Sequence, residues 1–208
     1  MTEAEALELL RARGWSDRDV RMLVDSTFGD HQAFCSRLKI RDKDGVLRVP
    51  DWSPSWAKLT EAIERQRRQG KPVRGIILKG RQVHFSAGCC THVFKRVAFM
   101  PGQHGRIFCD LHKNAANLYG YLKTYADYYQ SAGGIRPLGK VKGRADEKLI
   151  WPAGSWVEFG SAERATGGRS ASVRHLIGDE FAFWRDAETL MTGLLNSVPD
   201  DPDTMVLL

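Results

Sequence analysis

A short β-prone run at residues 173–178 leads directly into two adjacent carboxylates, Asp179 and Glu180. The run reads V-R-H-L-I-G and predicts a buried strand. At the carboxyl end of such a strand, Asp179 can hold Mg²⁺ and Glu180 can orient an attacking water, as in nucleotide hydrolases. A surface Asp-Glu pair is the plainer interpretation, so the functional one requires a phosphate-binding loop upstream.

A candidate for that loop lies about a hundred residues earlier in the chain. Residues 73–78 read V-R-G-I-I-L and predict another buried strand, residues 79–86 follow as a loop, and a helix is predicted over residues 87–97. A phosphate loop of the form G-x-x-x-x-G-K-[ST] has the same strand, loop and helix order. Its backbone N–H groups and the helix N-terminus bind phosphates, its Lys contacts the outer phosphates, and its hydroxyl binds Mg²⁺.

The residue types in this loop depart from that pattern, although the chemical groups that phosphate binding needs are retained. With Ser86 aligned to the hydroxyl position, Lys79, His84 and Phe85 stand where the pattern has Gly, Gly and Lys. Lys79 and Arg81 nevertheless supply cations, and Ser86 supplies the hydroxyl. The segment alone would also suit a basic turn between a strand and a helix. Its pairing with the later carboxylates favours a nucleotide site.

These motifs together resemble the large terminase subunit of tailed bacteriophages, the ATP-driven motor that packages viral DNA into a preformed capsid. Phosphate loops of that family often read [KR]-x-[RK]-Q-x-G-x-[ST], and residues 79–86, K-G-R-Q-V-H-F-S, depart from this form at His84, where Gly is usual. Four further segments are similar to the family in the same order: residues 34–50, 106–115, 160–169 and 176–184. The resemblance covers residues 34–208.

The resemblance implies ATP and Mg²⁺ as ligands. The implied nucleotide-binding residues are Lys79, Gly80, Arg81, Gln82, Val83, His84, Phe85 and Ser86. Lys79 is expected to be the phosphate-directed cation rather than Arg81, because shifted loops in the family keep a basic residue at the front. Ser86 and Asp179 would hold Mg²⁺ directly or through water, and Glu180 would polarise the attacking water.

Two further site residues are implied less directly. Arg169 lies 11 residues before Glu180, about where the family places an arginine donated to the neighbouring subunit's nucleotide. A surface arginine is the competing interpretation, with Arg164 and Arg174 as other candidates for that role. Family members contact adenine through a Gln near the start of the helix predicted here over residues 56–69. Trp56 stands in that region, where it either stacks on the base or packs the helix against the sheet.

We expect residues 34–208 to form a three-layer α/β P-loop NTPase domain of the ASCE type, with a mainly parallel central sheet. Residues 1–33 predict a small helical N-terminal extension, with helices over residues 2–13 and 16–28. Residues 204–208 predict a strand that ends where the family's coupling motif would begin, so the ATPase domain is expected to be incomplete. The family's nuclease domain is not expected within these 208 residues, and endonuclease activity is expected only of a longer protein.

Between these motifs, several segments have two interpretations. A helix predicted over residues 115–130 carries tyrosines suited to core packing or, less readily, to stacking on DNA bases. Residues 131–143 predict a loop in which Lys140 and Lys142, with Arg144 just beyond, either contact DNA or are solvated. Residues 148–151 and 156–159 flank P-A-G-S and predict a hairpin.

Composition is compatible with this interpretation. The formal charge of +6 and the pI of about 9.2 suit a polyanionic partner, although scattered Lys and Arg would give the same total. The four cysteines lack C-x-x-C spacing and are expected to be reduced core thiols. Neither a zinc site nor a secretory or membrane segment is predicted.

The resemblance implies double-stranded DNA, a portal protein and a small terminase subunit as partners, in the host cytoplasm. It also implies a homo-oligomeric ring, a pentamer, when assembled, whereas the isolated chain is expected to be monomeric and weakly active. Two alternatives remain open. One is another nucleic-acid-dependent P-loop ATPase such as a helicase core, and the other is a catalytically silent docking or DNA-binding module.

Overall fold

The computed structural model describes residues 8, 11–12, 14–18, 20, 29–42, 44–78, 84–129, 142–144, 147–164 and 172–208. Most of the two helices predicted within residues 1–28 lies outside the described residues. The same holds for residues 79–83 of the predicted phosphate loop and for residues 165–171, which include Arg169.

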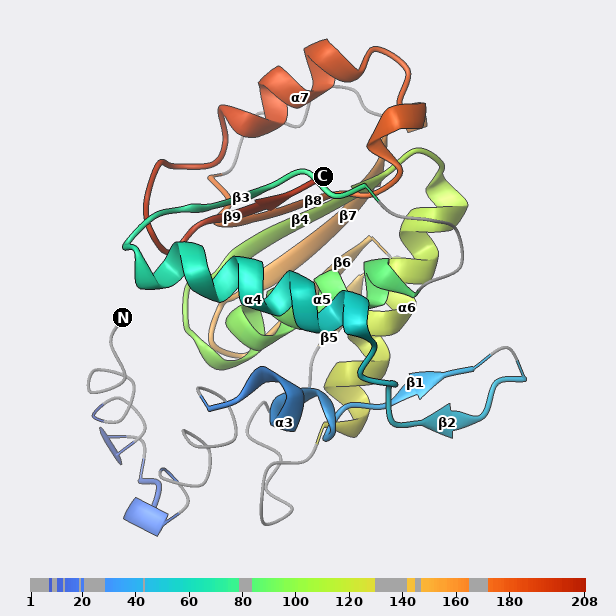
Figure 1. The fold of residues 1–208 in the computed structure, drawn as a ribbon. Helices are drawn as coiled ribbons and strands as arrows, with labels where there is room; N and C mark the ends of the chain where they lie inside the picture. The colour runs from blue at the N-terminus through green and yellow to red at the C-terminus, as the bar shows by residue number, and fades with distance from the viewer. Residues whose placement is uncertain are drawn as a thin grey trace.

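Within the described part, seven strands form one sheet in the order β3-β9-β8-β4-β7-β6-β5 (Figure 1). In that order they are β3 (Val73–Gly75), β9 (Met205–Leu207), β8 (His175–Gly178), β4 (His104–Cys109), β7 (Trp156–Ser161), β6 (Lys148–Ile150) and β5 (Lys142–Arg144). The first five are parallel to one another, and β6 and β5 extend the sheet in antiparallel fashion. Parallel strands are covered on both faces, and all four residues of β8 are buried accordingly.

Helices cover the two faces of this sheet unequally. Helices α4 (Pro54–Arg68), α5 (Phe85–Phe99) and α6 (His112–Tyr128) lie on one face, and α7 (Ala187–Leu195) lies on the other (Figure 1). The short elements are α3 (His31–Cys35), the hairpin of β1 (Ile40–Arg41) with β2 (Leu47–Arg48), and the 3₁₀ turns η1 (Ala162–Arg164) and η2 (Phe181–Phe183). This three-layer arrangement with a mainly parallel sheet confirms the predicted fold class.

Two clusters of buried side chains stabilise the layers. The larger lies between the sheet and helices α4, α5 and α6, and includes Phe94, Ile107 and Leu122. The smaller fixes α7 to the opposite face through Met191 and Leu194, packed among Leu176, Trp184 and Val206. The four cysteines are free and buried, as predicted. No helix among the described residues is long and apolar enough to cross a membrane.

The structure shows where two segments lie for which the sequence left two interpretations open. Tyr125 is fully buried on α6, where its hydroxyl donates to the carbonyl of Ala87 at 3.2 Å, and Tyr129 is also buried. These two rings therefore belong to the core rather than to a stacking surface. Lys142 was expected in a loop, but it lies in β5, which pairs with β6 in the antiparallel register Lys142 to Ile150. The predicted hairpin of β6 and β7 is confirmed.

Three buried histidines make the stability of this fold dependent on pH. His31 and His92 stack with their ring centroids 3.8 Å apart, and His175 is fully buried in β8. Burial lowers the pKa of all three, and nearby cations such as Lys95 and Arg67 lower the pKa of His31 further. The folded state therefore holds these imidazoles neutral, whereas the unfolded chain protonates them as pH falls below about 6.5.

We expect the free energy of unfolding to decrease as pH falls from 7.5 to 5.5. Each histidine that stays neutral in the folded state contributes a slope of up to about 1.4 kcal/mol per pH unit below about pH 6.5, so the three together give up to ~4 kcal/mol per unit. Urea unfolding at several pH values measures this slope. A free energy of unfolding that is constant across this range would contradict the prediction.

Candidate nucleotide-binding site

The fold brings the two predicted metal-binding residues into direct contact. Ser86 is the second residue of α5, and Asp179 directly follows β8. The Ser86 hydroxyl donates to Oδ1 of Asp179 at 2.8 Å, across a separation of 93 residues in sequence. Both groups lie at the carboxyl edge of the sheet, where ligands of open α/β folds bind. The pairing expected from the sequence is therefore present in the geometry.

The start of α5 is arranged to receive an anion. The N-cap residue His84 has a left-handed backbone, with φ of 46°, and its side chain makes no capping hydrogen bond. The first N–H groups of a helix have no partner within the helix, and the helix dipole adds partial positive charge at the same end. A phosphate is a suitable ligand for such an end. The positively charged residues proposed for this site, Lys79 and Arg81, lie outside the described residues.

The backbones of Asp179 and Glu180 differ in what fixes them. The Asp179 N–H donates to the Phe108 carbonyl at 2.7 Å, and the indole N–H of Trp184 donates to the Asp179 carbonyl at 3.0 Å, so strand pairing and a side chain both fix its backbone. Glu180 has a φ of 54°. Among the described residues, His84, Glu180 and Asp186 are the non-glycine residues with positive φ. Such backbone costs free energy and is concentrated at functional sites, which agrees with a role for Glu180.

Two buried or half-buried side chains, Cys90 and Tyr121, lie within electrostatic range of Asp179. Burial raises the pKa of the Cys90 thiol on α5, and the charges of Cys89 and Asp179 raise it further. Burial also raises the pKa of the half-buried Tyr121 on α6, followed by the effects of Cys90 and Asp179. Tyr121 thus lies within electrostatic range of Asp179, the predicted metal ligand. The sequence suggested only a core or rim position for this tyrosine, because its spacing is that of an ordinary amphipathic helix.

Trp56 lies next to the loop but is enclosed by protein. Its side chain is 3% exposed, and its indole N–H donates to the carbonyl of His84 at 3.2 Å. The indole also contacts Gly88, where an added Cβ would lie 2.7 Å from Nε1. Of the two interpretations drawn from the sequence, this geometry favours packing over stacking on a base.

An apolar groove of about 430 Å³ runs between α4 and the edge strand β3. Its lining includes Leu78, the last described residue before position 84, and Phe85, the first residue of α5. Ser55 and Lys58 of α4 provide polar groups on the opposite wall. Leu78 is 99% exposed, so the groove presents apolar surface to solvent beside the predicted phosphate loop.

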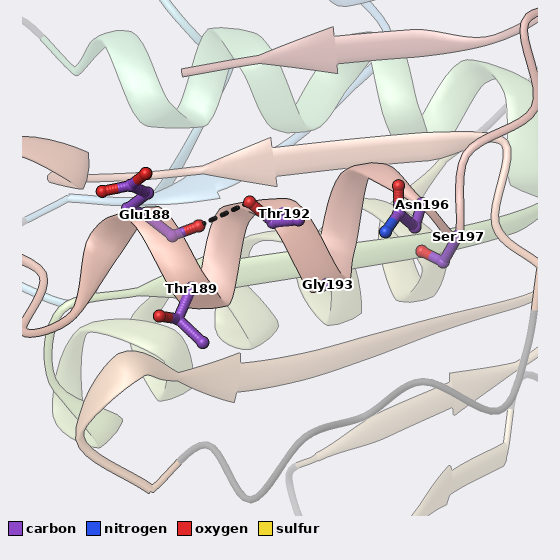
Figure 2. A pocket seen from close by; sticks show the side chains of 6 residues that line it. All are labelled: Glu188, Thr189, Thr192, Gly193, Asn196 and Ser197. Atoms are coloured by element: carbon purple, nitrogen blue, oxygen red, sulfur yellow. Dashed lines mark hydrogen bonds between the residues drawn. The ribbon is translucent and has the colours of Figure 1, made fainter.

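A second pocket, of about 500 Å³, lies along α7 (Figure 2). Its described lining consists of Glu188, Thr189, Thr192, Gly193, Asn196 and Ser197. The Thr192 hydroxyl donates to the Glu188 carbonyl at 2.8 Å and is therefore already engaged. This described lining carries a carboxylate and no cation, so it does not suit a nucleotide phosphate.

Of the predicted site residues, the structure places Ser86 against Asp179, Glu180 beside that pair, and His84 and Phe85 at the start of α5. A serine hydroxyl and a carboxylate are the hard oxygen ligands that Mg²⁺ requires, so these residues fit that ion. Lys79, Gly80, Arg81, Gln82, Val83 and Arg169 are outside the described residues.

No family model and no curated protein matches this chain. Solved structures do. The large terminase of bacteriophage HK97 matches with a TM-score of 0.65 at 14% sequence identity, over 85% of this chain and 36% of that chain. The ATPase domain of the Thermus phage P74-26 large terminase matches with a TM-score of 0.51 at 17% identity, over 70% of this chain and 62% of that one.

A point mutant of the P74-26 domain gives a TM-score of 0.50 at 18% identity. These matches identify the fold as that of a large terminase ATPase domain, a P-loop fold, in agreement with the sequence resemblance. The chain spans 36% of the HK97 terminase and 62% of the P74-26 domain. At these identities the likeness concerns the fold, and function must be argued from the site.

Proposed function

We propose that this chain is an ATPase motor domain of a viral DNA-packaging terminase, which hydrolyses ATP to translocate double-stranded DNA into a procapsid. The observation that carries the proposal is the 2.8 Å contact between Ser86 and Asp179. It joins the residue that ends the predicted phosphate loop to the carboxylate that ends β8. The terminase fold supports the proposal, because ATPase domains of that fold are among the structures that match.

The proposed site residues divide the chemistry between them. The start of α5 receives the phosphates, with Lys79 or Arg81 neutralising their charge. The hydroxyl of Ser86 and the carboxylate of Asp179 would hold Mg²⁺, which when bound would neutralise charge on the phosphate oxygens. Glu180, one residue further along, accepts a hydrogen bond from the attacking water and orients it. The buried surroundings of Cys90 lower the local dielectric near Asp179 and strengthen these interactions.

The groove between α4 and β3 offers a place for the nucleotide base. Its apolar lining includes Leu78 and Phe85, which lie on either side of the phosphate loop in sequence. A flat aromatic base would cover such surface, while Ser55 and Lys58 could accept or donate hydrogen bonds at its edge. This assignment separates base binding from Trp56, whose ring is enclosed.

A neighbouring subunit would complete each site in an assembled ring. Arg169 is our proposed donor, because the stabilisation of transition-state charge by an arginine in trans contributes about 10³-fold or more to rate. If so, mixing Arg169→Ala subunits with Glu180→Gln subunits restores part of the hydrolysis lost in each alone. Mixed assemblies with no recovery would move this role to another residue, such as Arg164 or Arg174.

Phosphate release in the presence of double-stranded DNA tests the proposed function. We expect ATP turnover by the assembled protein to rise on addition of linear duplex DNA. Portal protein and small terminase subunit would be the further components of a packaging assay. Turnover stimulated equally by single-stranded nucleic acid would favour a helicase-like ATPase. DNA binding without any turnover would favour a silent docking or DNA-binding module.

A further inference from the structure

Trp56 connects the first turns of two helices at the predicted phosphate loop. Ser53 caps α4 by accepting a hydrogen bond from the Trp56 N–H at 3.3 Å, which places this tryptophan in the first turn. From there the indole N–H reaches the His84 carbonyl at 3.2 Å. His84 is the N-cap of α5 and the described residue directly following the 79–83 loop.

The indole is fixed in this position on two sides. Gly88, one turn into α5, leaves the space that the ring occupies, since an added Cβ there would lie 2.7 to 2.9 Å from three indole atoms. Trp52 packs edge-on against the ring with centroids 6.2 Å apart. A ring that is held on both sides and 3% exposed has one orientation, and in that orientation its N–H points at the loop backbone.

The carbonyl that it binds belongs to a strained residue. His84 has a φ of 46°, a left-handed conformation that costs free energy for a residue with a side chain. That conformation sets the direction in which the chain enters α5 and therefore where the first N–H groups of the helix point. A hydrogen bond to the His84 carbonyl from a fixed donor stabilises this geometry before any ligand arrives.

We propose that Trp56 is a positioning residue for the phosphate loop, which holds His84 in its left-handed conformation and so pre-forms the anion-binding start of α5. The role rests on the proposed nucleotide function of that loop. It differs from base stacking in what it predicts, because a positioning residue acts on phosphate binding whether or not a base is present.

The test compares Mg²⁺-ATP with Mg²⁺-tripolyphosphate, which has the three phosphates and no base. Trp56→Phe keeps most of the ring against Gly88 but removes the N–H donor. Calorimetric titration should show both ligands binding about threefold to tenfold more weakly, by the same factor, as expected for the loss of one hydrogen bond. Trp156→Phe, at the amino end of β7, is the matched control and should leave both affinities unchanged.

Gly88→Ala provides a second way to break the hydrogen bond between Trp56 and His84, because its Cβ would push the indole away from His84. It should weaken both ligands in the same way, while Gly120→Ala on α6, where an added Cβ meets nothing within 4 Å, should not. Thermal unfolding midpoints confirm that each variant is folded, and if Trp56→Phe is not, Gly88→Ala makes the comparison.

The possible outcomes distinguish the positioning role of Trp56 from the proposed nucleotide function. A loss confined to ATP would mean that Trp56 contacts the base and would overturn the positioning role. Unchanged affinity for both ligands in Trp56→Phe would also overturn it, while leaving the proposed function intact. Wild-type protein that binds neither ligand would overturn the proposed function, and the positioning role would fall with it.

Discussion

Replacing Glu180 with Gln should reduce ATP turnover by about 10²- to 10⁴-fold, the usual contribution of a positioned general base, while ATP affinity stays near that of the wild type. Gln has nearly the same shape but cannot accept the proton of the attacking water. Glu180 directly follows Asp179, the proposed metal-binding carboxylate, and its backbone has a left-handed φ of 54°, which is a conformation concentrated at functional sites. Phosphate release by the assembled protein and a separate binding titration measure the two quantities.

Glu188→Gln is the control for this change. Glu188 is an exposed carboxylate on α7, eight residues further along, and its substitution removes the same charge without touching the site. Its turnover should equal that of the wild type. If Glu180→Gln turned over ATP at the normal rate, the base would have to be another residue.

Ser86→Ala and Asp179→Asn should each weaken Mg²⁺-dependent ATP binding by at least about tenfold. Substituting a residue that only supports a metal ligand already lowers metal affinity or activity about 10- to 100-fold. Ser86 and Asp179 are proposed as ligands themselves, directly or through water. Their side chains lie 2.8 Å apart, so they would act on one ion. The double variant should therefore lose little more ATP affinity than the weaker-binding single variant, because the effects of substitutions at residues that share a partner are not additive.

The same variants measured in excess EDTA provide the control. Without Mg²⁺ there is no ion for Asp179 to bind. Removing its negative charge should then not weaken the binding of the anionic nucleotide. The affinities of the single and double variants should then converge on that of the wild type. Losses that persist undiminished in EDTA would show that the substitutions disturb the fold instead.

The sequence predicted most of the central layers because their signals are local, but the buried strand predicted over residues 73–78 was too long: β3 ends at Gly75, and Leu78 is 99% exposed. The run at residues 173–178 is apolar and ends in carboxylates, and the structure places β8 there. Helix α4 begins at Pro54, two residues before the predicted start at residue 56, because Ser53 caps it and Pro54 opens it. Helix α7 was not predicted. Its nine residues are stabilised by tertiary contacts of Met191 and Leu194 with the sheet, which no local pattern reveals.

The site was predictable in part. The residue types at Ser86 and Asp179 indicated metal binding, and their contact agrees with that interpretation. Tyr121 could not be placed near Asp179 from sequence, because helical spacing fixes which face a residue shares but not which strand end that face approaches. The two possible environments of Trp56 differ only in burial against α5, which depends on the space left by Gly88 some thirty residues away.

The most direct test of this account is the affinity of the wild-type chain for ATP with Mg²⁺ and with excess EDTA, measured by calorimetric titration. The Ser86–Asp179 pair predicts saturable binding that Mg²⁺ strengthens by at least about tenfold, since these two residues would hold the ion and the ion would neutralise charge on the phosphates. Equal affinity in the two conditions, or no binding in either, would contradict a metal-dependent nucleotide site at this edge of the sheet.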